Sequence, residues 1–201
     1  TGGFASAYVL RSDTGVSQGF EVYDATLPPA AADQAPAEIL RAGPATLAAG
    51  RKWLGTLADG RFFLFFHIYE PHAPYTPPAR FAMPDAYDGE VAYADEIIGQ
   101  LLGSLRQRQW YDTATIVLTA DHGEGLDDHG EKEHGLFVYE ETIRVPLATK
   151  LPNLRRGNSR TASLVQHIDL VPTLTRLAGL NPPSGIRGRS LEPLLTGRGE
   201  I

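Results

Sequence analysis

The segment Thr113-Ala-Thr-Ile-Val-Leu-Thr-Ala-Asp121-His122-Gly123-Glu124 has the pattern of a strand that ends in polar residues. A short apolar segment rich in β-branched residues, typical of a buried strand, runs directly into an acidic residue, a histidine and a glycine. Arg61–Tyr69 is a second segment of this kind. It runs into the proline-rich stretch Glu70–Pro78, which we expect to be a stiff loop. In an α/β sheet, ligand sites form at the carboxyl ends of the strands, where these polar residues lie.

Helical periodicity lies between and beside these strands. Pro44–Leu57 begins with a proline that suits a first helical turn. Tyr87–Gln107 also has a helical pattern. Its expected buried side carries Val91, Ile97, Ile98, Leu101, Leu102 and Leu105. A further helix is expected over Leu164–Leu177, with Pro172 near its first turns, and a short helix or coil over Leu191–Leu195.

Two more strands complete the pattern. We predict one over Phe4–Leu10 and one over Thr142–Thr149, the second interrupted by Pro146. Loops or turns are predicted for Leu27–Pro36, Glu124–Lys132, Asn153–Ser159 and Asn181–Gly188. Strands that alternate with helices predict an α/β layered fold.

The composition is that of a globular protein. A chain of 201 residues fits one domain or a large piece of one, and its 42% hydrophobic and 21% charged residues argue against overall disorder. The net charge of −6 and the lack of a basic block give no sign of nucleic-acid binding. There is no cysteine, so disulfides and thiolate metal sites are excluded.

No targeting or membrane segment is evident in the sequence. The longest apolar run, from Phe62 to Ile68 across His67, is far too short to cross a bilayer. The first ten residues lack the basic region and long apolar core of a secretory signal. The compartment stays open between the bacterial cytoplasm and the periplasm.

Asp121 and His122 are the first candidates for chemistry, since they follow a strand. A carboxylate and a neutral imidazole are suitable ligands for a divalent metal, and Gly123 would let the backbone turn away sharply. The alternative is a solvent-facing turn in which Asp121 caps a helix. The tripeptide by itself favours that alternative.

His72 lies in the proline-rich loop after the other strand, so we expect it at the same edge of the sheet. Prolines on both sides would hold it with little loop entropy, as a general acid or hydrogen-bond donor requires. The alternative is that the prolines merely stiffen a turn. The loop alone does not decide between these two interpretations.

The segment from Glu124 to His134 is dense in titratable groups and includes Lys132. Most such segments are solvated surface loops, but a concentration of histidines here raises the case for function. Arg144 is expected to pair with Glu140 or Glu141 rather than with an anion. Structural roles are likewise expected for Asp169 and His167.

Together these segments resemble the sulfatase family of the alkaline phosphatase-like superfamily. Glu70-Pro71-His72-Ala73-Pro74-Tyr75 resembles the family's Asp-Pro-His-x-Pro-Tyr loop, and Thr119–Glu124 resembles its metal-binding turn. The other matching segments, in the family's order, are Tyr87–Asp95, His134–Gly135, Tyr139–Leu147, Asp169–Leu174 and Gly188–Leu195. The resemblance implies part of a three-layer sandwich with a mainly parallel central sheet flanked by helices.

The resemblance also implies roles for individual residues. Asp121 and His122 match two divalent-metal ligands, calcium being favoured over manganese or magnesium, with zinc a further alternative. His72 matches a histidine that contacts the sulfate and its leaving-group oxygen. His134 stands where many members have a sulfate-contacting lysine. An imidazole titrates near pH ~6.5, so Lys132 is a second candidate for the permanent charge.

One departure from the family matters most. The nucleophile motif Cys/Ser-x-Pro-Ser-Arg, whose first residue matures to formylglycine, is absent, as are the paired acidic ligands expected near the start. We therefore expect residues 1–201 to be the C-terminal part of one catalytic domain, without its nucleophile-bearing part. The isolated chain should bind metal weakly and turn over little substrate. A sheet divided in this way should expose an edge and an apolar face through which the chain could self-associate.

The implied partner is a small-molecule or carbohydrate sulfate ester, which loop Leu27–Pro36 would help to select. Two other classes of function stay open. The first is a phosphonate or phosphate ester hydrolase, or a phospho-group transferase, on the same scaffold. The second is a non-catalytic binding module, which the retained histidines and Asp121 count against.

Overall fold

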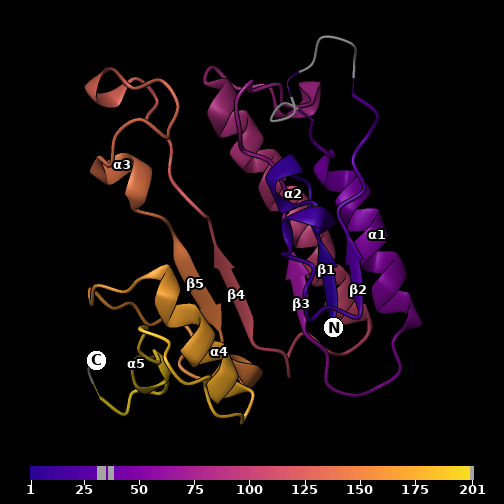
Figure 1. Cartoon of the computed structure of the whole chain (residues 1–201), viewed down its shortest axis with the longest axis vertical. Coiled ribbons are helices and arrows are strands. Elements are labelled where there is room, and N and C mark those ends of the chain that lie inside the picture. The colour runs from indigo at the N-terminus through magenta and orange to yellow at the C-terminus, as the bar shows by residue number, and fades with distance from the viewer. Residues whose placement is uncertain (31–34, 36–38, 200–201) are drawn as a thin grey trace. The chain divides into compact units, whose positions relative to one another are not determined.

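The computed structural model describes residues 1–30, 35 and 39–199. The chain divides into two compact units, Thr1–Gln107 and Arg108–Ile201, which are described separately (Figure 1). The predicted excursion Leu27–Pro36 is irregular over residues 27–30, while residues 31–34 and 36 lie outside the described part. No helix of the described residues has the length and apolar character needed to cross a membrane.

The first unit is built on a parallel sheet with strand order β2-β1-β3. The strands are β1 (Gly2–Phe4), β2 (Val22–Asp24) and β3 (Leu64–Phe66). Two helices, α1 (Gly43–Thr56) and α2 (Ala86–Gln107), complete the unit. The α/β class and the predicted parallel sheet are confirmed here.

Close packing of α1 on the central strand explains why β1 begins with glycines. A Cβ on Gly2 would lie 2.7 Å from the Trp53 ring, whereas the bare backbone admits it. The Trp53 ring lies 5.8 Å from that of Phe4, which is 2% exposed. Glycine is depleted in strands, so Gly2 and Gly3 gave no strand signal and the strand was predicted to begin at Phe4.

The helices of the first unit are close to their predicted bounds, and two other expectations fail. The strand predicted over Phe4–Leu10 is wrong, because β1 ends at Phe4 and Tyr8–Leu10 forms a 3-10 turn. The predicted burial of Val91 is also wrong, since this side chain is 43% exposed. The buried stripe of α2 instead passes through Glu90, followed by Ala94, Ile97, Leu101 and Leu105.

The second unit contains an antiparallel pair, β4 (Ile116–Thr119) with β5 (Leu147–Lys150). Thr119 is paired with Leu147, so the end of β4 that leads to Asp121 adjoins the start of β5. The helices are α3 (Glu140–Ile143), α4 (Leu170–Leu177) and α5 (Glu192–Thr196). The parallel arrangement therefore holds for the first unit's sheet and not for this pair.

Two predicted element boundaries in the second unit are wrong. Thr142 and Ile143 are helical, and β5 begins only after Pro146, which cannot donate to a strand ladder. The helix predicted from Leu164 begins as a 3-10 turn at His167. The Asp169 carboxylate accepts from the Gln166 backbone N–H at 2.9 Å and so defines that start.

Candidate active site

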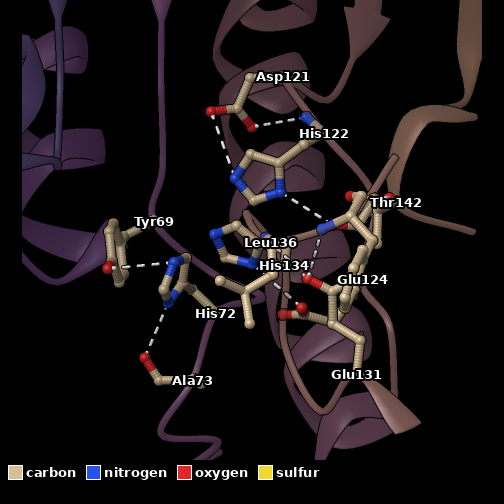
Figure 2. Close-up of polar contacts among 12 residues, drawn as sticks. Tyr69, His72, Ala73, Asp121, His122, Glu124, Glu131, His134, Leu136 and Thr142 are labelled. Atoms are coloured by element: carbon tan, nitrogen blue, oxygen red, sulfur yellow. Dashed lines mark hydrogen bonds and ion pairs between the residues drawn. The ribbon is translucent and has the colours of Figure 1, made fainter. Parts of the chain in front are cut away.

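In the first unit, His72 is held on both ring nitrogens. It lies in the irregular loop that follows β3, and the prediction of a loop over Glu70–Pro78 is confirmed. Its Nδ1 lies 2.8 Å from the Ala73 carbonyl oxygen, and its Nε2 lies 3.3 Å from the Tyr69 hydroxyl (Figure 2). The Tyr69 and His72 rings stack with centroids 4.2 Å apart. Because a carbonyl only accepts, the hydrogen is on Nδ1, which leaves Nε2 as the nitrogen that can gain or lose a proton.

In the second unit, Asp121 and His122 lie just beyond the end of β4, as predicted. The His122 Nδ1 donates to the Gly123 carbonyl at 2.8 Å, so the lone pair is on Nε2. That Nε2 lies 3.8 Å from Asp121 Oδ2, and the Asp121 side chain is 77% exposed. Metal-bound histidines commonly donate their second N–H to a backbone carbonyl in this way.

The donor set of this pair fits a divalent metal. Ligand distances to such ions are about 2.0–2.6 Å, so two ligand atoms 3.8 Å apart can contact the same ion. A carboxylate oxygen suits calcium, magnesium or manganese, and one imidazole nitrogen is also accepted by manganese and zinc. By itself, the pair could supply two of the ligands of such a site.

His134 joins this arrangement from the other end of the loop. Its ring stacks on His122 with centroids 3.8 Å apart and an angle of 27° between the planes (Figure 2). Its Nδ1 lies 3.1 Å from Oε1 of Glu124, whose side chain is only 6% exposed. Lys132, the alternative sulfate-contacting residue, is exposed. The structure therefore brings three of the five predicted site residues together within the second unit.

The predicted role of Gly123 changes in the structure. A Cβ at this position would overlap the carbonyl oxygen of Glu141, and the Gly123 N–H donates to the Thr142 carbonyl at 2.8 Å. Gly125 is similar, because a Cβ there would overlap the Glu131 and Glu133 carbonyls. Glycine is needed at both positions because neighbouring backbone lies so close. At Gly123 the neighbour is α3, and at Gly125 it is the far end of the same loop.

Buried carboxylates hold both histidine loops, and sequence reasoning missed them. Glu131 is 5% exposed, and its Oε1 accepts from the N–H groups of Leu136 and Phe137 at 2.9 and 3.3 Å. Glu90 is 6% exposed and bonds the backbone of the His72 loop. A buried glutamate is almost always paired with a hydrogen-bond donor or a cation. A single sequence does not show which acidic residues are buried, so these two could not be identified from it.

A second group of metal-type ligands was also missed. Ligand atoms of Asp128, His129 and Glu141 all lie within 4.8 Å of one another, in the one such cluster of at least three among the described residues. His129 Nδ1 lies 2.7 Å from Glu141 Oε1. That hydrogen bond raises the pKa of His129. The pKa of Glu141 is lowered, first by a hydrogen bond from the Glu141 backbone N–H and second by the hydrogen bond from His129. The geometry is that of an ion pair at the surface.

The three residues expected to be structural have structural contacts. Arg144 lies 3.6 Å from Glu140 in an exposed pair one helical turn apart. Asp169 is 6% exposed, and its second oxygen accepts from the Arg189 N–H at 2.8 Å. His167 Nε2 lies 2.8 Å from the Ala120 carbonyl, which precedes the candidate metal ligands.

Comparisons with known proteins match the chain to one family. The family model described as Sulfatase matches residues 44–180. An N-acetylglucosamine-6-O-sulfatase of Bacteroides thetaiotaomicron is 36% identical over 114 residues, which are 57% of this chain and 20% of that protein. The steryl-sulfatase of Rattus norvegicus is 30% identical over 150 residues, or 68% of this chain and 26% of that protein.

Solved structures agree on the fold. A phosphonate monoester hydrolase of Agrobacterium radiobacter has a TM-score of 0.71 at 19% identity and covers 79% of this chain and 42% of its own. This likeness concerns the fold alone. The chain spans about a fifth to a quarter of the length of the curated relatives named above.

Proposed function

The chain belongs to the sulfatase family, and on that premise we propose that it supplies part of the active site of a metal-dependent sulfuric ester hydrolase. One observation carries the proposal. Asp121 and His122 present an oxygen and a nitrogen 3.8 Å apart, with the His134 ring stacked on His122. The substrate we propose is the sulfate ester of a sugar, because the bacterial relative at 36% identity is named for a sugar sulfatase.

We assign Asp121 and His122 as metal ligands. Sulfatases are typically metal-dependent, and a divalent ion would offset charge on the sulfate and on the nucleophile when bound. The Gly123 carbonyl holds His122 Nδ1–H, so that Nε2 keeps its ligand form. We propose calcium as the metal, with manganese or magnesium as alternatives, if the remaining ligands of the site are oxygens.

His134 is assigned to the sulfate group. The Nδ1–H donates to Glu124 at 3.1 Å and fixes the ring, and in the imidazolium form the Nε2–H would donate to a sulfate oxygen. Lys132 is the alternative, because its charge is permanent at neutral pH. Comparison of His134→Ala with Lys132→Ala in the full-length protein separates the two. Full activity in both variants would overturn the assignment.

His72 is assigned to the leaving group. As the sulfur–oxygen bond breaks, its electron pair passes to the leaving oxygen, and a proton on His72 Nε2 would neutralise that oxygen. The Ala73 carbonyl fixes Nδ1, and the stacked Tyr69 ring fixes the plane of the imidazole. The shared sheet edge predicted for His72 and Asp121 involves both units and stays a prediction.

The nucleophile is proposed to come from residues outside these 201, because the family's nucleophile motif is absent from them. We therefore expect the isolated chain to bind calcium or manganese weakly and to leave an aryl sulfate intact. The test is an assay of the isolated chain beside the full-length protein, with a sugar sulfate, an aryl sulfate and a phosphonate monoester. If the isolated chain hydrolysed a sulfate ester as fast as a complete sulfatase, the proposal that its nucleophile lies outside these residues would be wrong. If the full-length protein hydrolysed only the phosphonate, the reaction would be phosphonate hydrolysis and not sulfate hydrolysis.

Self-association of the isolated chain is the remaining proposal about partners. Apolar side chains at the sheet of the first unit are partly open to solvent, with Val22 41% and Phe63 47% exposed. Covering them would remove apolar surface from water. Light scattering of the isolated chain tests this, and a stable monomer that binds no hydrophobic dye would argue against it.

A further inference from the structure

Glu90 is a buried acid in a stripe of otherwise small or apolar residues. It lies in the second turn of α2 and is 6% exposed, in line with Ala94 and Ile97 on the buried side. Glutamate is almost never fully buried unless it is paired. Removing a carboxylate from water is costly, so its position requires compensating donors.

Those donors are backbone amides of the His72 loop. Glu90 Oε2 accepts from the His72 N–H at 3.3 Å, and Oε1 accepts from the Thr76 N–H at 3.0 Å. Prolines at positions 71, 74, 77 and 78 have no N–H, so this loop cannot form a regular backbone ladder. One carboxylate on a rigid helix therefore holds the loop on both sides of residues 73–75.

The held segment includes the group that orients the imidazole. His72 Nδ1 lies 2.8 Å from the Ala73 carbonyl, and Ala73 lies between the two amides that Glu90 accepts. If the clamp is lost, this carbonyl and the ring bonded to it lose their fixed position. A displacement of about 1 Å in a catalytic group can cost about 10²-fold in rate.

We propose that Glu90 is a positioning residue for His72, acting through the backbone amides of His72 and Thr76. The inference rests on the proposed function of His72 as the leaving-group acid. It goes beyond that function because it assigns a buried residue on α2 to the proton-transfer step. Glu90 itself contacts the loop and carries no proton in the reaction.

The test uses the full-length protein, with the variants Glu90→Ala, Glu90→Gln and His72→Ala. Glu96→Gln is the matched control, because Glu96 is on the same helix but pairs at the surface with Arg80. Each variant is assayed on an alkyl or sugar sulfate, whose leaving group needs a proton, and on 4-nitrophenyl sulfate, whose leaving group does not. Melting temperatures identify variants that fail to fold.

For Glu90→Ala we expect kcat/KM to fall about 10²-fold on the poor leaving group and less than about tenfold on 4-nitrophenyl sulfate. Glu90→Gln should show the same pattern more weakly, since an amide keeps only one acceptor for the two N–H groups. Hydrogen exchange of the His72 and Thr76 amides should accelerate in both variants. Glu96→Gln should match the unaltered protein.

The outcomes separate this inference from the function on which it rests. Absence of sulfatase activity in the unaltered protein, or a His72→Ala variant without leaving-group dependence, would overturn the proposed function. A leaving-group effect in His72→Ala that is absent from a folded Glu90→Gln would overturn the role of Glu90 alone. An equal loss on both substrates in Glu90→Gln would reduce Glu90 to a structural role and also overturn it.

Discussion

The two loops that carry the candidate histidines, one after β3 and one after β4, are held in position in different ways. The loop after β3 is stiffened by prolines and held from outside by Glu90 of α2. The loop after β4 is closed by glycines, whose missing side chains admit neighbouring carbonyls, and is held from within by Glu131. Proline restricts the backbone before folding, whereas glycine permits contacts that only the folded chain makes.

This difference predicts different weak points. Prolines leave the first loop with fewer N–H donors, and two of those donors, on His72 and Thr76, are accepted by the Glu90 carboxylate of α2. The second loop has several backbone bonds of its own and two sites of close backbone approach, so it depends on space as well as on the Glu131 acceptor. Substitutions that remove space should damage the second loop most, and the loss of an acceptor should be the main damage in the first.

The largest expected effect is that of Gly123→Ala. Its Cβ would overlap the Glu141 carbonyl, a backbone group that cannot move without opening the loop. We expect the free energy of unfolding to fall by about 1–3 kcal/mol or more, measured by denaturant titration of the isolated chain.

Gly99→Ala in α2 is the matched control, because a Cβ there meets nothing within 4 Å. It should be neutral or stabilise the chain by up to about 1 kcal/mol, since alanine is the better helix former. Equal effects of the two substitutions would mean that close approach does not define the second loop.

A smaller effect is expected for the carboxylate that holds the second loop. Glu131 uses one oxygen, Oε1, for both amides, while its buried Oε2 has no hydrogen-bond partner among the described residues. Glutamine keeps the acceptor and removes a buried charge, so Glu131→Gln should change the free energy of unfolding by less than about 1 kcal/mol.

Glu131→Ala removes the acceptor and should cost about 1–3 kcal/mol in the same denaturant titration. Glu90 differs from Glu131 because both of its carboxylate oxygens accept a hydrogen bond, so Glu90→Gln must lose one of the two. A Glu131→Gln variant as damaged as Glu131→Ala would break this distinction.

The smallest effect is expected from the surface pair His129–Glu141, which has no counterpart in the first loop. The hydrogen bond to Glu141 raises the pKa of His129. The pair's contribution to the free energy of unfolding is therefore fully present below pH ~6.5, and it is lost as pH rises through the raised pKa. At the acid end, the lowered pKa of Glu141 means that the contribution is lost only as pH falls through that lowered value.

Glu141→Gln should therefore lower the melting temperature slightly at pH 6 and leave it unchanged at pH 9. Glu140→Gln is a suitable control, because Glu140 precedes it in α3 and pairs with Arg144, which stays charged at both values. A deficit that is the same at pH 6 and pH 9 would show that the imidazole charge plays no part.

Several features of the fold were predictable because they depend on neighbours in sequence. Periodicity located α1 and α2 within one residue of their ends. The proline content predicted the irregular loop that carries His72. Boundaries failed where glycine formed a strand, at β1, and where a proline divided a helix from a strand, before β5.

Short motifs in a fixed order identify the family, and with it the candidate site residues Asp121, His122, His134 and His72. The contacts that hold those residues in place become visible only in the folded chain. Glu90 lies 18 positions from His72, and the close approach of Gly123 to the Glu141 carbonyl depends on two backbone segments that meet after folding. Motifs record which groups are present, whereas burial and close approach arise from contacts between distant segments, which no local pattern encodes.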